Sequence, residues 1–151
     1  MNSGNYKKLY LMLTLSFLIM YSVMFFNVEE NDHIYLSLTR TYMAFLMTTP
    51  MAVMMILLMP KMYPNKKKNM IIISSNILIF IISLIFLRNQ IPIGDEQYMK
   101  AMIPHHSSAI LTSKNADIKD AEVKRLSEEI IKAQVEEIKQ MKEILNRLKN
   151  E

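Results

Sequence analysis

The chain of 151 residues has no cysteine, no tryptophan and only three histidines. Without cysteine it forms neither disulfides nor thiolate sites, so a soft metal ion would have to be bound by methionine and histidine. The sequence also lacks a phosphate-binding glycine loop, the G-x-S-x-G motif of serine hydrolases and the H-E-x-x-H helix of zinc proteases. We therefore expect a protein without catalytic turnover.

Charged residues are missing from three long apolar runs in the first 90 residues. Each run is close to the length of about 20 residues that a helix needs to cross a bilayer. The sequence therefore predicts a membrane region over residues 1–90. Its three transmembrane helices are expected at about Leu9 to Val28, Thr41 to Met59 and Met70 to Leu87.

The first run has an alternative interpretation as a cleaved signal peptide. Lys7 and Lys8 would form its basic start, but the run ends in "MFFNVEEN" without a small-x-small cleavage pair. An uncleaved signal-anchor is therefore the preferred interpretation.

Lysines in the short loops predict the orientation of this region in the lipid bilayer. They precede the first run and separate the second from the third, whereas the loop between the first and second is acidic, with Glu29, Glu30 and Asp32. Because cytoplasmic loops are enriched in lysine and arginine, we expect a cytoplasmic N-terminus and an extracytoplasmic C-terminal region. The net charge of +4 then reflects topology, and we expect no nucleic-acid partner.

Residues 95–151 have a different composition, and predict two amphipathic helices joined as a hairpin. Asp95 is the expected N-cap of the first helix, which ends near Ser113, and "KNADIKD" separates it from a second helix that begins near Asp120. The expected apolar seam of the second helix is Val123, Leu126, Ile130, Met141, Ile144, Leu145 and Leu148. Two such short helices bury too little surface to be stable alone. We expect a homodimer that completes a four-helix bundle, or alternatively packing against the membrane helices.

The dipeptide His105-His106 stands out in the first of these helices. Helical projection places His106 in the middle of the apolar face and His105 at its edge, near Tyr98. If the hairpin turns about Asp117, Met102 lies level with Gln134, and Met99 lies level with Glu137.

Two interpretations of this layer stay open. In the first, His106 is a core histidine bonded to Glu137 and the methionines only fill space, so that the hairpin is a structural module scaffolding a membrane complex. In the second, the layer binds a metal: thioether and imidazole suit Cu(I), whereas imidazole and carboxylate suit Cu(II) or zinc. Pro104 either bends the helix for packing alone or directs the two histidines toward different partners.

A second methionine pattern lies in the second apolar run, where Met43, Met47, Met51, Met55 and Met59 are four residues apart. The stripe is interpreted as lipid-facing filler, with a path for a soft cation as the less favoured alternative.

The stretch "DEQYMKAMIPHHSSAI", followed by "LSEEIIKAQVEEIKQMKEIL", resembles the bacterial family known as domain of unknown function 305. The resemblance covers Asp95 to Leu148. It implies an exported or membrane-anchored, ferritin-like helical bundle, in which some members bind copper outside the cytoplasm. Many relatives hold two copies of the hairpin where this chain has one. The pattern positions are occupied by Asp95, His105, His106, Gln134, Glu137, Ile138 and Met141.

Together these observations predict an all-α, membrane-anchored, extracytoplasmic protein that buffers copper or hands it to a copper-handling membrane partner. Gln134 and Asp95 are expected to orient the ligands. The predicted metal ligands are His105, His106, Met99, Met102, Met141 and Glu137. Iron oxidation is disfavoured, because neither predicted helix of residues 95–151 carries the Glu-x-x-His pair of di-iron bundles.

Overall fold

The computed structural model describes residues 3–150, which form helices and no strand, as predicted for an all-α protein. The elements are α1 (Ser3–Val23), the short 3-10 helix η1 (Asn31–His33), α2 (Leu38–Leu58), α3 (Lys66–Asn89), α4 (Asp95–Asn115) and α5 (Ala121–Lys149). The chain packs into two units. The N-terminal unit comprises residues 3–23 and 39–92, and the C-terminal unit comprises residues 24–38 and 93–150.

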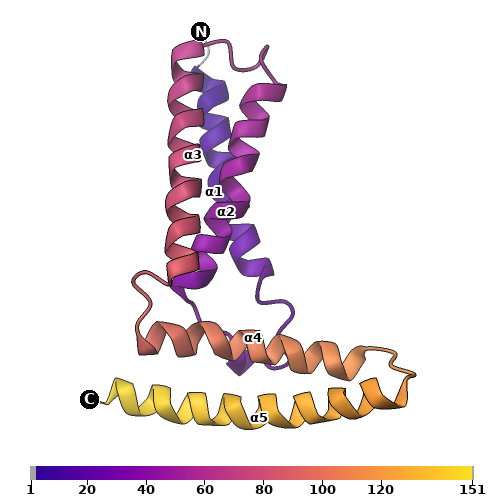
Figure 1. Cartoon of the computed structure of the whole chain (residues 1–151). Helices are drawn as coiled ribbons and strands as arrows, with labels where there is room; N and C mark the ends of the chain where they lie inside the picture. Colours follow the sequence, from indigo (N-terminus) through magenta and orange to yellow (C-terminus); the bar gives the residue numbers. More distant parts are fainter. Residues whose placement is uncertain (1–2, 151) are drawn as a thin grey trace. The chain divides into compact units, whose positions relative to one another are not determined.

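In the N-terminal unit, α1, α2 and α3 run side by side (Figure 1). Tyr6 and Leu9 of α1 are buried in one cluster with Ile56 and Ile72, and the Phe17 and Phe45 rings lie 4.7 Å apart between α1 and α2. Polar contacts join the helices as well. The Tyr6 hydroxyl donates to Asn69 Oδ1 at 2.7 Å, close to the Asn65 side chain that caps α3.

Two helices of this unit, α2 and α3, are long and apolar enough to cross a membrane. The predicted bounds of the first span are wrong, and α1 is not one of these two helices. The helix there begins at Ser3 and ends at Val23, whereas the expected span was Leu9 to Val28. Every 18-residue segment of α1 therefore includes Lys7 and Lys8, and the apolar residues from Met24 onward lie outside the helix.

The methionine stripe is only partly on the surface of the N-terminal unit. Met43 and Met47 of α2, and Met59 just after its end, are each more than one third exposed, whereas Met55 packs against the buried cluster. The exposed methionines agree with apolar filler on the outside of the helix.

The C-terminal unit is built on α4 and α5, which lie antiparallel and side by side (Figure 1). Asp120 caps α5 by accepting hydrogen bonds from the backbone N–H groups of Glu122 and Val123. The sequence placed the N-cap of α4 at Asp95, but the capping residue is Gly94, and Asp95 occupies the first helical turn. The buried apolar residues of this unit are Ile103, Ile110, Ile138, Met141 and Leu145.

The register between α4 and α5 differs from the predicted one. His106, rather than Met99, lies opposite Glu137, a shift of about two helical turns along α4. The reason is that the connecting segment and the first turn of α5 are not part of the packing between the two helices. This packing begins where the Ser127 hydroxyl donates to the Ser113 carbonyl at 3.3 Å.

The predicted seam of α5 is also only partly buried. Met141 and Leu145 pack against α4, whereas Val123, Leu126 and Ile130 are exposed by 37% or more. One neighbouring helix covers only part of the apolar stripe of α5, so one edge of the stripe stays uncovered.

Residues 24–38 complete the C-terminal unit, although composition alone placed its start near residue 95. The division into residues 1–90 and 95–151 is a statement about composition and stays a prediction. By packing, the acidic loop belongs with α4 and α5: the Ser107 hydroxyl accepts a hydrogen bond from Glu29 N at 2.7 Å, and Gln97 Oε1 accepts one from Leu38 N at 3.0 Å.

Candidate functional site

His106 is held at the interface of α4 and α5 with both ring nitrogens engaged. Nδ1 lies 2.9 Å from the Met102 carbonyl oxygen, and Nε2 lies 2.9 Å from Glu137 Oε2. A carbonyl oxygen can only accept a hydrogen bond, so Nδ1 carries a proton. Nε2 is the other ring nitrogen, and it faces Glu137 on α5.

His106 Nε2 and Glu137 Oε2 lie within hydrogen-bond distance of each other, at 2.9 Å. A metal ion that bound Nε2 would displace this contact. The Glu137 side chain is 50% exposed, so it is free to swing aside or to become a ligand.

Three methionine side chains line one cavity together with His106. A cavity of about 320 Å³ is lined by Met99, Met102, His106, Glu137 and Met141. The structure thus brings together five of the six residues that the sequence proposes as ligands. Tyr98, Gln140 and Ile144 complete the lining and were not among the proposed ligands.

The other proposed residues lie outside this cavity. His105 is exposed on α4, and its ring centre lies 6.2 Å from that of His106. Gln134 Nε2 donates to Glu137 Oε2 at 3.4 Å, which fits a role in orienting that carboxylate. Asp95 is at the start of α4 and does not line the cavity.

A second cluster of polar groups surrounds His33, which sequence reasoning missed. His33 is only 6% exposed, and its Nδ1 lies 2.8 Å from the hydroxyl oxygen of Ser107. Nε2 faces two carboxylates, with Asp32 Oδ1 at 3.6 Å and Glu30 Oε2 at 3.9 Å. The available signal was the Glu-x-x-His spacing of Glu30 and His33 in the acidic loop.

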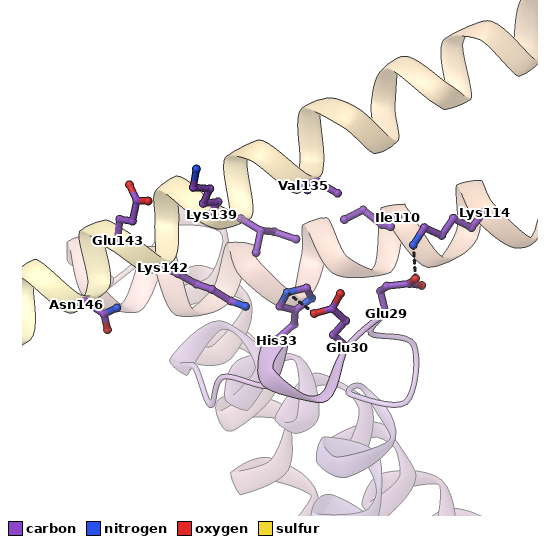
Figure 2. Close-up of a pocket in the computed structure, with 11 residues that line it drawn as sticks. Glu29, Glu30, His33, Ile110, Lys114, Val135, Lys139, Lys142, Glu143 and Asn146 are labelled. Carbon is purple, nitrogen blue, oxygen red and sulfur yellow. Dashed lines mark hydrogen bonds and ion pairs between the residues drawn. The ribbon is translucent and has the colours of Figure 1, made fainter.

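Lysines from α4 and α5 hold this acidic loop in place (Figure 2). Lys142 Nζ lies 2.6 Å from Asp32 Oδ2, and Lys114 pairs with Glu29. The hydrogen bond from Lys142 lowers the pKa of Asp32, and burial lowers the pKa of His33. The His33 ring is therefore neutral at pH 7, with two carboxylates near its Nε2.

Substitution of Ser107 by alanine tests how the acidic loop is held. Ser107 is fully buried and binds both Glu29 N and the His33 ring, so Ser107→Ala leaves two buried polar groups without a partner. We expect a loss of about 1–3 kcal/mol in the local stability of residues 24–38, measured by hydrogen exchange of these backbone amides.

Ser108→Ala is the matched control, because Ser108 contacts only the exposed Asn27 side chain in this loop. We expect it to change the exchange of residues 24–38 by about 0.5 kcal/mol or less. Equal effects of the two variants would contradict the role assigned to Ser107.

Comparison with known proteins supports the resemblance seen in the sequence. Residues 87–150 match a family model described as "Domain of unknown function (DUF305)". An uncharacterized protein of Acanthamoeba polyphaga mimivirus is 38% identical over 148 residues, which span 96% of this chain and 95% of that protein. No solved structure matches the chain. The chain belongs to the same family as this mimivirus protein, and its residues 87–150, which include α4, α5 and both residues of the histidine pair, match the domain of unknown function 305.

Proposed function

We propose that the protein is a membrane-anchored, extracytoplasmic metal-binding protein that buffers copper or hands it to a membrane partner. The observation that carries the proposal is that three methionines, His106 and Glu137 line one cavity. The nearby carboxylate and the absence of cysteine define the chemistry of the site.

Thioether and imidazole groups are ligands of choice for Cu(I). In the proposed Cu(I) form, Met99, Met102, Met141 and His106 Nε2 bind the ion, and Glu137 moves outward. With Glu137 as a ligand the same cavity suits Cu(II), with zinc as an alternative. The hydrogen bond between His106 Nδ1 and the Met102 carbonyl fixes the ring, as outer partners of metal-binding histidines commonly do.

His105 has a separate part in this proposal. Because it is exposed on the same turn of α4, we assign it to capture of the ion at the surface, ahead of the buried site. This assignment predicts a smaller loss of affinity when His105 is changed than when His106 is changed.

Membrane anchoring rests on α2 and α3. Most large apolar side chains of the N-terminal unit point outward, among them Leu57, Leu58, Ile71 and Leu78, and a lipid bilayer would cover them. If α2 and α3 each cross the bilayer once, the segment before α2 and the segment after α3 lie on the same side of the membrane. Residues 24–38 and 93–150 then share one side, as their packing into one unit requires.

The orientation follows from the positive end of the N-terminal unit. Tyr6 of α1 contacts Asn69 of α3, and Lys68 Nζ lies 5.4 Å from the centre of the Tyr6 ring. The lysines near the start of α1 and those before α3 are therefore at the same end of the unit. Under the positive-inside rule this end is cytoplasmic, which places the C-terminal unit outside.

A homodimer is proposed through the uncovered edge of α5. Val123, Leu126 and Ile130 are exposed and recur at helical spacing. A second copy of the chain would cover this apolar edge and would complete a four-helix, ferritin-like bundle from two antiparallel pairs.

A second candidate function is a structural module without metal. It is favoured by the fact that both nitrogens of His106 already have protein partners, at 2.9 Å each. Under this alternative the contact with Glu137 only fixes the register of α4 against α5. The His105→Ala/His106→Ala double variant would then lose the same stability with and without metal.

The copper site is tested by titrating the full chain in detergent with Cu(I) against a competing chelator, and separately with Cu(II). We expect stoichiometric Cu(I) binding. In His106→Ala the affinity should fall about tenfold or more, which is about 1.4 kcal/mol or more, and in His105→Ala it should fall less.

Methionine substitutions provide the control, because leucine keeps the volume of methionine and removes the sulfur. Met99→Leu/Met102→Leu should weaken Cu(I) binding, whereas Met62→Leu, outside the C-terminal unit, should leave it unchanged. Unaltered binding in the His105→Ala/His106→Ala variant, or no stoichiometric binding by the native chain, would refute the copper proposal.

The orientation is tested with single cysteines, which the native chain lacks. Lys119→Cys places a thiol at an exposed site between α4 and α5, and Lys67→Cys places one at the start of α3. In intact spheroplasts of a bacterial host, a membrane-impermeant maleimide should label only the first variant, and lysis should expose the second. The reverse pattern would overturn the orientation, and equal labelling before lysis would contradict membrane anchoring.

The dimer is tested by sedimentation of the full chain in detergent. We expect the native chain to sediment as a dimer, and Leu126→Glu/Ile130→Glu to sediment as a monomer because charges would replace the apolar edge. Lys132→Glu changes an exposed residue of the same helix and should leave the dimer intact. A native chain that stays monomeric at all concentrations would rule the dimer out.

A further inference from the structure

His33 is a buried histidine that the proposed copper site does not use. It ends η1, is 6% exposed and belongs to a segment outside the matched family region. Its Nδ1 is held at 2.8 Å by the hydroxyl of Ser107, and Ser107 is itself completely buried in α4. The hydrogen bond to Ser107 therefore fixes the orientation of the ring. The second nitrogen, Nε2, is directed away from α4.

Nε2 of His33 has no hydrogen-bond partner in the part of the chain that the structure describes. Its nearest carboxylate oxygens, from Asp32 and Glu30, are 3.6 Å and 3.9 Å away, beyond the usual range of about 2.7–3.2 Å for such a bond. One ligand atom from each of the three residues lies within 4.8 Å of the other two. Figure 2 shows the His33 ring and the Glu30 carboxylate side by side, below α5.

The spacing of these three atoms suits a small divalent cation. Zinc bonds of about 2.0–2.2 Å in a tetrahedral site place neighbouring ligand atoms about 3.3–3.6 Å apart. Both carboxylate side chains are 65% exposed, so small rotations suffice to close the observed separations. The bond from His33 Nδ1–H to Ser107 would be the outer hydrogen bond that fixes a metal-binding imidazole.

We propose that Glu30, Asp32 and His33 form a second metal site, for a borderline divalent cation of the zinc type. One imidazole and two carboxylates without sulfur are hard to borderline ligands, which distinguishes this site from the methionine-rich cavity around His106. Three protein ligands leave a fourth position for water. All three ligands come from the acidic loop. They lie where Ser107 of α4 and Lys142 of α5 contact this loop.

Lys142 is a built-in competitor for this ion. Its Nζ lies 2.6 Å from Asp32 Oδ2, whereas Asp32 Oδ1 faces His33. The ammonium group neutralises one carboxylate and repels a cation bound a few ångströms away. Removal of this charge, with all three ligands retained, should therefore strengthen metal binding.

The test is a zinc titration of the full chain in detergent, in the His105→Ala/His106→Ala background so that the first site makes no contribution. After treatment with EDTA, we expect one zinc ion per chain. Affinity should fall about tenfold or more in His33→Gln and in Glu30→Gln, and should rise severalfold in Lys142→Met.

Glu143→Gln is the matched control, because Glu143 lines a cavity of about 330 Å³ together with Glu30 and His33 but is not one of the three ligands. It should leave zinc affinity within about twofold of the background. Hydrogen exchange of residues 24–38 reports whether each variant keeps the loop in place. If His33→Gln loosens the loop, Lys142→Met decides the question, since it keeps every ligand.

Three results would overturn the second site. These are no stoichiometric zinc in the background variant, equal affinity in His33→Gln with the loop intact, and unchanged or weaker binding in Lys142→Met. Loss of zinc binding in this background leaves the copper proposal unaffected, because the copper titration uses the native His105 and His106.

Discussion

The packing of Ile103 and Ile110 against Ile138, Met141 and Leu145 is the interaction on which the C-terminal unit depends. It fixes the register of α4 against α5, and the register decides which polar groups meet. Apolar burial is not directional, but in this unit it brings one imidazole to one carboxylate, and both line one cavity with three methionines. A shift of one helical turn would separate His106 from Glu137.

Consecutive residues of α4 face different neighbouring elements. His106 faces Glu137 on α5, whereas Ser107, the next residue, faces the acidic loop and the ring of His33. The step of about 100° per residue separates the two directions. A single turn of α4 therefore supports both polar clusters, and its burial keeps them at fixed positions relative to each other.

Local features were predictable from the sequence, and long-range ones were not. The apolar runs gave α2 and α3, and the polar break near Asp117 gave the separation of α4 from α5, because hydrophobic periodicity is a local property. The register of α4 against α5 was wrong, because it depends on where packing begins after the connecting segment. The three methionines, His106 and Glu137 nevertheless share one cavity, since their spacing within each helix places them on the facing sides.

The His33 cluster was missed for a different reason. Its residues lie in a segment whose negative charge indicates an extracytoplasmic loop. No periodicity in the sequence links that segment to α4 or α5. The contacts that define the cluster join Glu29 to Lys114 and Asp32 to Lys142, residues 85 and 110 positions apart in the chain. Nothing in the sequence of either partner alone indicates such a pairing.

The C-terminal unit is discontinuous in sequence, and this has a consequence for biosynthesis. Residues 24–38 leave the ribosome before α2 and α3, whereas their partners in α4 and α5 leave after them. The acidic loop therefore has no partners until α2, α3 and both later helices have been synthesised. The C-terminal unit forms late, because contacts between distant residues form only after the intervening segment has been made.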